Sequence, residues 1–360
     1  MIKKYVYGDP FFTDAVVKDI EKSEDKLPYF DVKDGVFTYA LSEDDIVYGL
    51  GEQIRGINKR GWQYVSWNYD NPNHHEDTRS LYGSHNFIII CGKQTFGAFF
   101  DYAGRMEFDI GYTKRSLMQI KPEKNDIAVY IISGENEKDI VKQFRQLIGR
   151  SYIPPFWAFG YGQSRWGYKN EQDIRTVAEK YREAGVPLDS IYLDIDYMER
   201  YKDFTVDKER FPDLKKLSDD MKSQGIHLVP IIDAGVKIED GYDVYEEGVK
   251  NNYFCKNAEG KDFVGAVWPG RVHFPDFLQP EARDWFGRKY AALTDLGIEG
   301  FWNDMNEPAI FYTEDRLADT CNEIKKLTSG NMGINEYFAF TGMVAGLNGN
   351  KGDYDKFYHN

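Results

Sequence analysis

Three aspartates occupy equivalent places in the sequence, each at the end of a short apolar run that follows a glycine. The pairs are Gly185 and Asp194, Gly225 and Asp233, and Gly297 and Asp304, with separations of 9, 8 and 7 residues. Carboxylates that converge on one point can stabilise a developing positive charge, transfer a proton or attack as nucleophiles. The spacing therefore predicts one acidic site to which all three aspartates contribute.

Helices that alternate with short strands are expected to position these aspartates. The expected helices begin after Asn170, near Leu214 and at Pro280, and each ends at one of the three glycines. The expected strands are residues 159–163, 190–193, 227–232 and 298–302. Such repeats produce parallel strands, and ligands bind beyond their carboxyl ends. The pattern fits a (β/α)₈ barrel and also an open doubly wound sheet.

The first part of the chain has a different pattern. Short apolar strands, for example residues 86–90 and 95–100, are separated there by Gly, Asn and Asp, which is typical of a β-sandwich. We therefore expect a β-sandwich over residues 1–150 and an α/β unit over residues 151–360. Residues 237–280 and 308–360 are too long for ordinary connections and are expected to be insertions.

Composition narrows the classes of partner and compartment. The formal net charge is -14, which argues against a nucleic-acid partner. No segment has the length and apolar character of a secretory signal or a membrane span. Three widely spaced cysteines fit inert thiols in a reduced cytoplasmic protein. No glycine-rich phosphate loop or metal-loop motif is present, so the sequence predicts no cofactor and no metal.

Two simpler roles for strand-end aspartates compete with catalysis. A single aspartate at such a position often caps the following helix, and grouped aspartates can hold a metal ion. Three aspartates in matching positions, with tryptophans nearby and no basic cluster, instead favour a site for an oxocarbenium-like transition state. The chemistry predicted from the residues is therefore glycosyl transfer to water or to another acceptor.

Four motifs resemble glycoside hydrolase family 31, in the order in which that family carries them. They are residues 194–198 (DIDYM), 230–233 (PIID), 267–270 (VWPG) and 302–308 (WNDMNEP). Residues 48–52 (YGLGE) and 152–155 (YIPP) are similar to its sandwich and linking segments. The likeness is greatest to bacterial α-glucosidases. It implies an N-terminal β-sandwich followed by the first half of a (β/α)₈ TIM barrel with insertions.

The resemblance also implies roles for individual residues. Asp304 corresponds to the nucleophile that forms a covalent glycosyl-enzyme, and Asp194 corresponds to a residue that binds glucose hydroxyls. The substrate-binding positions implied by the resemblance, besides Asp194, are Asp70, Trp166, Ile195, Ile231, Asp233, Trp268, Trp302 and Met305. Turn formation competes for Asp70 and core packing competes for Trp166. The expected partner is a small α-glucoside or oligosaccharide.

One part of the expected machinery has no counterpart here. A retaining mechanism needs a second carboxyl group as general acid and base, about 5 Å from the nucleophile. The resemblance places that residue about a hundred positions after Asp304, whereas the chain continues for only 56 residues. We therefore expect an N-terminal fragment that is inactive alone. α-Xylosidase, transglucosidase and a non-catalytic sugar-binding protein remain alternative functions.

Overall fold

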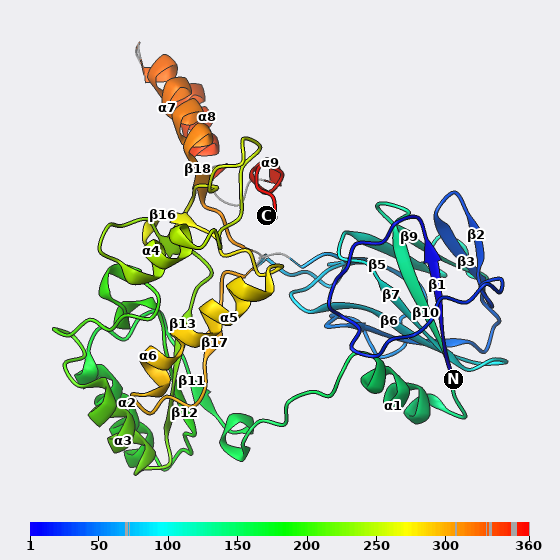
Figure 1. Ribbon diagram of the computed structural model, residues 1–360, viewed down its shortest axis with the longest axis horizontal. Coiled ribbons are helices and arrows are strands. Elements are labelled where there is room, and N and C mark those ends of the chain that lie inside the picture. The colour runs from blue at the N-terminus through cyan, green and yellow to red at the C-terminus, as the bar shows by residue number, and fades with distance from the viewer. Residues whose placement is uncertain are drawn as a thin grey trace. The chain divides into compact units, whose positions relative to one another are not determined.

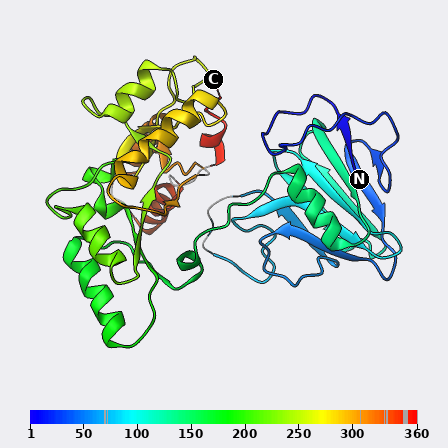
Figure 2. The ribbon, with the colours of Figure 1, turned by 60° about the horizontal axis from the view of Figure 1, so that its bottom comes forward.

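The computed structural model describes residues 1–68, 71, 73–306, 308–328, 330, 333–346 and 351–359. The chain divides into two compact units, residues 1–153 and 154–360. The first contains almost only strands, and the second mixes helices with short strands. Figures 1 and 2 show the elements of each unit.

Two antiparallel five-stranded sheets make up the first unit. In one the order is β1 (Ile2–Tyr7), β10 (Ile127–Ser133), β7 (Phe96–Asp101), β6 (Ser84–Cys91) and β4 (Ile46–Gly51). In the other it is β2 (Asp31–Lys33), β3 (Val36–Ala40), β9 (Leu117–Pro122), β8 (Met106–Ile110) and β5 (Trp62–Ser66). Side chains alternate along each strand, so each sheet offers one apolar face to the other.

The core of the first unit lies between these sheets. Phe37, Phe108 and Ile120 from one sheet pack with Phe100 and Val129 from the other. Helix α1 (Glu137–Leu147) covers the outer face of the first sheet (Figure 1). The predicted β-sandwich is therefore confirmed.

A parallel four-stranded sheet organises the second unit. Its order follows the sequence: β11 (Gly162–Gln163), β12 (Ser190–Leu193), β13 (His227–Ile232) and β17 (Trp302–Asn303). The helices between these strands are α2 (Glu171–Glu183), α3 (Leu214–Lys222), α5 (Pro280–Lys289) and α6 (Ala291–Thr294). This order of parallel strands and helices is that of the first half of a (β/α)₈ barrel.

The helix ends agree with the sequence at all three predicted glycines. The Asn170 side chain accepts a hydrogen bond from Asp173 N at 3.0 Å and so caps α2. Gly185, Gly225 and Gly297 have φ of 66°, 77° and 89°, the left-handed conformation that ends a helix at glycine. The third helix is split into α5 and α6, because Tyr290 N bonds to Gly287 O three residues back and tightens the chain.

Two predicted strands are shorter than expected. The prediction for residues 159–161 is wrong, because a 3₁₀ turn, η1 (Phe156–Phe159), occupies the start of that segment. The prediction for residues 298–301 is also wrong. Strand β17 pairs with β13 only at Trp302 and Asn303, so the ladder begins just before Asp304.

The two expected insertions have regular structure of their own. They build a second sheet of order β14 (Val236–Lys237), β16 (Gly270–His273), β15 (Gly265–Val267) and β18 (Tyr312–Thr313). The helices there are α4 (Asp243–Lys250), α7 (Glu314–Thr328), α8 (Ile334–Ala345) and α9 (Lys351–Tyr354). Because β18 pairs with β15, the two insertions fold together. No helix in the described part of the chain has the length and apolar character to cross a bilayer.

Candidate active site

The register of the parallel sheet brings the strand-end aspartates to one face. Leu193 pairs with Pro230 and Ile231 pairs with Trp302, so Asp194 follows at the level of Ile231. Asp233 and Asp304 follow the Ile232–Asn303 pair, so they lie at equal register, two positions beyond the level of Ile231. Residues at equal register in a parallel sheet point to the same side, and the side alternates along each strand. The three aspartates therefore converge, as their spacing predicted.

Hydrogen bonds fix two of these aspartates. Asp304 N donates to Ile232 O at 3.1 Å, which continues the ladder between β13 and β17 beyond the last strand residue. Asp194 begins the 3₁₀ turn η2 (Ile195–Tyr197), and its Oδ1 accepts the Ile195 N–H at 2.8 Å. The backbone thus holds both carboxyl groups at the sheet edge rather than on free loops.

The electrostatics show that the carboxyl groups act on one another. Burial raises the pKa of Asp194, and the charges of Asp304 and Asp196 raise it further, against the hydrogen bond from Ile195. Burial, followed by the charges of Asp304 and Asp194, raises the pKa of Asp233 to about 7. A proton on Asp233 therefore relieves repulsion in a site that holds several acidic groups.

Asp203 is a further acidic residue of this region that sequence reasoning missed. It is 1% exposed, and its Oδ1 accepts the Asp233 N–H at 3.0 Å. Burial, with a smaller contribution from the charge of Asp233, holds the pKa of Asp203 well above its usual range. Within the described ranges neither Asp203 Oδ2 nor Asp233 Oδ1 has a hydrogen-bond partner. Asp203 lies in an irregular segment, so no periodicity points to it.

Apolar residues border the aspartates. Ile195 and Ile231 are buried, and Trp302 is half-buried with its ring 6.4 Å from that of Tyr192 in an edge-on contact. Met305 has φ of 60°, a left-handed conformation that is strained for a residue with a Cβ. This conformation turns the chain sharply after Asp304, and the Met305 side chain packs against the apolar cluster of the second sheet.

Two predicted tryptophans come together at the surface. The rings of Trp166, after β11, and Trp268, between β15 and β16, lie 5.9 Å apart at 35°. Trp166 is 68% exposed and Trp268 is 42% exposed, which excludes core packing as the role of Trp166. The Trp268 ring also contacts the Phe311 ring edge-on, with 4.9 Å between the ring centroids. The pair offers flat apolar surface to a ligand.

Two other acidic positions complete the comparison with the sequence. Asp196 lies 3.6 Å from Arg210 Nη1, and its carboxylate approaches the Gly167 backbone so closely that a Cβ at that position would meet it at 1.9 Å. Asp196 therefore has a supporting role in the loops around the site. Asp70 lies outside the described residues.

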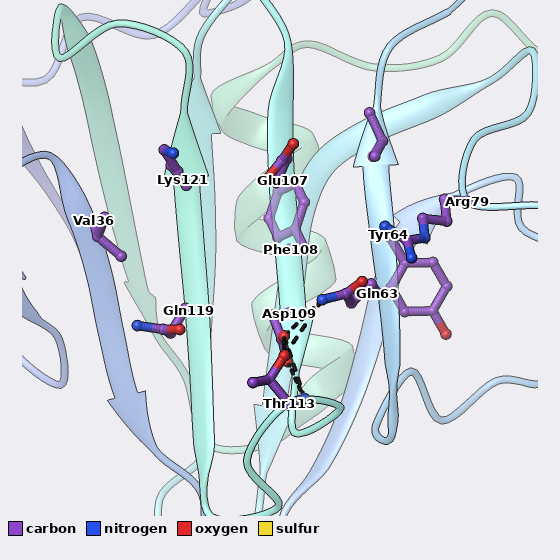
Figure 3. Close-up of a pocket in the computed structure, with 11 residues that line it drawn as sticks. Val36, Gln63, Tyr64, Arg79, Glu107, Phe108, Asp109, Thr113, Gln119 and Lys121 are labelled. Atoms are coloured by element: carbon purple, nitrogen blue, oxygen red, sulfur yellow. Dashed lines mark hydrogen bonds between the residues drawn. The ribbon is translucent and has the colours of Figure 1, made fainter.

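The first unit has a pocket of its own. It has a volume of about 310 Å³ and lies on the outer face of the sheet formed by β2, β3, β9, β8 and β5 (Figure 3). Its central carboxylate, Asp109, accepts hydrogen bonds from Gln63 and Thr113, as Figure 3 shows. Although burial opposes ionisation, these hydrogen bonds bring the pKa of Asp109 below its usual value. The carboxylate is satisfied locally and does not resemble a catalytic acid.

Comparison with known proteins decides the family. The model of the glycosyl hydrolases family 31 TIM-barrel domain matches residues 151–352. The chain belongs to glycoside hydrolase family 31. The N-terminal galactose mutarotase-like domain of the same family matches residues 15–109. The predicted (β/α)₈ barrel is therefore confirmed, and the alternative of an open doubly wound sheet is excluded.

Relatives of this family 31 chain include two microbial enzymes. It is 44% identical over 273 residues to alpha-glucosidase 2 of Bacillus thermoamyloliquefaciens, which covers 75% of the chain and 35% of that protein. It is 29% identical over 331 residues to an alpha-glucosidase of Saccharolobus solfataricus, which covers 90% of the chain and 48% of that protein. The chain thus spans between a third and a half of these relatives.

Solved structures agree with this assignment. A family 31 dextranase of Flavobacterium johnsoniae in complex with glucose has a TM-score of 0.70 at 28% identity, covering 78% of this chain and 35% of the dextranase. The same dextranase as a mutant with isomaltotriose has a TM-score of 0.71 at 28% identity, covering 81% of this chain and 36% of that one. The partial barrel of this chain therefore corresponds to part of a longer catalytic fold.

Proposed function

We propose that this chain is part of a retaining α-glucosidase in which Asp304 is the nucleophile. The observation that carries the proposal is the register of β12, β13 and β17, which sets Asp304 on one face with Asp194 and Asp233. Membership of family 31 and the names of the two microbial relatives support the same chemistry.

In the proposed reaction the Asp304 carboxylate attacks the anomeric carbon of a terminal glucose. The bond to the leaving oxygen breaks, and a general acid supplies the proton to that oxygen. Water then displaces Asp304 from the glycosyl-enzyme and gives its proton to the same residue. Negative charge on Asp304 and Asp194 stabilises the oxocarbenium-like transition states.

The remaining residues bind and orient the sugar. Asp194 accepts hydrogen bonds from hydroxyl groups of the terminal glucose. Asp233 lies at the same register as Asp304 and contributes a second carboxyl group to the acidic face. Ile195, Ile231, Trp302 and Met305 form apolar walls. We place the Trp166–Trp268 pair at the rim, where it stacks on the ring that follows the scissile bond, and we assign Asp70 to the same side. The proposed substrates are α-glucosides and short oligosaccharides, and the proposed compartment is the cytoplasm.

Trapping of the covalent intermediate tests the nucleophile. The complete protein that contains this sequence would be treated with 5-fluoro-α-glucosyl fluoride, digested and analysed by peptide mass spectrometry. We expect the label on the peptide that contains Asp304. Asp304→Asn should abolish labelling, whereas Asp284→Asn, on the exposed face of α5, should leave it unchanged. Label on another residue would refute the assignment.

Two further measurements separate the alternative functions. Release of glucose from maltose, compared with release of xylose from α-xylosides and with formation of longer oligosaccharides, distinguishes α-glucosidase from α-xylosidase and transglucosidase. Calorimetry with acarbose detects a protein that binds sugar without turnover. We expect no hydrolysis of p-nitrophenyl α-glucoside by residues 1–360 alone, because none of the residues assigned above acts as the general acid.

A further inference from the structure

A second convergence of reactive side chains lies in the insertions of the second unit. Cys255, Asp276 and His359 each place one ligating atom within 4.8 Å of the others. The three residues belong to segments that are 21 and 83 residues apart in sequence. No spacing motif joins them, and the sequence predicted no metal and inert thiols.

Backbone pairing fixes the segments that carry these residues. Cys255 N donates to Phe274 O at 2.9 Å, and Asp276 N donates to Tyr253 O at 2.8 Å. On the other side, Lys256 and Tyr358 exchange two backbone hydrogen bonds at 2.8 and 2.7 Å. The three ligating residues therefore come from extended segments that are held in register before any ligand binds.

The side chains differ in freedom. Cys255 and Asp276 are buried, and Asp276 accepts bonds at 3.2 Å from Leu278 N and from Gln279 Nε2. The Cys255 Sγ donates a long hydrogen bond of 3.8 Å to Pro275 O. His359 is half-exposed, with its Nδ1 2.6 Å from Asp276 Oδ1. Two of the ligating side chains are thus buried, and the third reaches the surface.

We propose that Cys255, Asp276 and His359 bind a divalent transition-metal ion of the Zn²⁺ class. A thiolate, an imidazole and a carboxylate form a donor set that suits Zn²⁺, whereas Mg²⁺ and Ca²⁺ prefer oxygen donors alone. Three protein ligands leave a fourth tetrahedral position for water. The site is independent of the glycosidase proposal, because none of its residues belongs to the strand-end aspartates.

Metal binding requires small movements of the donor atoms. With Zn–S of about 2.3 Å and Zn–N and Zn–O of about 2.0 to 2.2 Å, tetrahedral donors lie roughly 3.3 to 3.6 Å apart. The His359 ring must therefore retreat from Asp276 by about 1 Å, and Cys255 Sγ must approach the other donors, since the three atoms are separated by up to 4.8 Å. Binding forms a metal–sulfur bond, breaks the S–H bond of Cys255 and releases that proton to solvent. Burial, reinforced by the charge of Asp276, raises the thiol pKa to about 12, so the thiol is protonated without the ion.

Titration of residues 1–360 with Co²⁺ tests the proposal, since Co²⁺ reports sulfur ligation through a thiolate-to-metal absorption band. We expect one equivalent to bind and to produce this band, and Zn²⁺ to remove it by competition. Cys255→Ser should abolish the band and weaken Zn²⁺ binding at least about 100-fold, because loss of a direct ligand exceeds the usual effect of losing a supporting residue. His359→Ala should weaken binding similarly.

The other two cysteines provide matched controls. Cys91→Ser and Cys321→Ser remove a half-buried and an exposed thiol and should leave the band and the affinity unchanged. The absence of any band in the wild-type chain would overturn the proposal. Binding that survives both Cys255→Ser and His359→Ala would also overturn it, because the ion would then occupy another site and the Asp276–His359 contact would be a purely structural hydrogen bond.

Discussion

Replacement of Asp233 by asparagine should remove a pH dependence from the stability of the second unit. The folded-state pKa of Asp233 is about 7 against an ordinary value of 3.8, so the native state binds this proton more tightly than the unfolded chain does. Stability from this group is therefore highest below about pH 4, falls as pH rises to about 7, and is then constant. At 1.36 kcal/mol per unit the full difference is about 4 kcal/mol.

Coupling to the other aspartates reduces the observable effect. Because the Asp304 and Asp194 charges contribute to the shift, part of it depends on their own ionisation. Between pH 5 and 8 the linkage can supply at most about 2.6 kcal/mol, and we expect about 1 to 2.5 kcal/mol. Asp203 titrates in the same direction and remains in both proteins. The substitution also exchanges a buried carboxyl group for an amide, which changes the free energy of unfolding by an amount that does not depend on pH. The informative quantity is therefore how the difference in unfolding free energy between Asp233→Asn and wild type changes with pH.

Urea unfolding at four pH values between 5 and 8 provides the measurement. Five of the seven tryptophans lie in the second unit, so near-UV circular dichroism and fluorescence follow its transition. The stability of Asp233→Asn relative to wild type should rise by the stated amount over this range. Asp284→Asn, which changes an exposed carboxylate, should track wild type. Parallel pH curves for wild type and Asp233→Asn would show that Asp233 is ionised at little cost, and the reasoning about this acidic face would fail.

Two other substitutions test the site and the packing. Trp268→Ala should raise KM for maltose about 3- to 10-fold in the complete protein with a smaller change in kcat, as expected for loss of a stacking surface worth about 1 kcal/mol. Trp62→Ala, at the same 42% exposure in the first unit, should leave KM unchanged. Equal effects of the two substitutions on KM would remove Trp268 from the site. Gly248→Ala in α4 should destabilise the second unit by about 1 to 3 kcal/mol, because the new Cβ would lie 2.3 Å from the Phe254 ring. Gly287→Ala in α5 meets nothing within 4 Å and should stabilise by about 0.5 to 1 kcal/mol, so denaturation midpoints that move in the same direction would contradict the packing argument.

Sequence reasoning succeeded where the controlling interactions are local. The Asn170 cap and the left-handed glycines at 185 and 225 depend on contacts within one helical turn, and both occur as predicted. The lengths of β11 and β17 were wrong because strand length depends on a partner elsewhere in the chain. The ladder between β13 and β17 contains only two residue pairs, a limit that residues 298–301 do not encode.

The sequence by itself determined the order of elements, the family motifs and the positions of the aspartates at strand ends. Only the tertiary structure decided that Asp203 is buried against Asp233, that Trp166 meets Trp268, and that Cys255, Asp276 and His359 converge. The physical reason is the distance along the chain over which the controlling contacts act. Caps and turns arise from hydrogen bonds between near neighbours, whereas these groupings depend on strand register and backbone pairing between segments 21 to 104 residues apart.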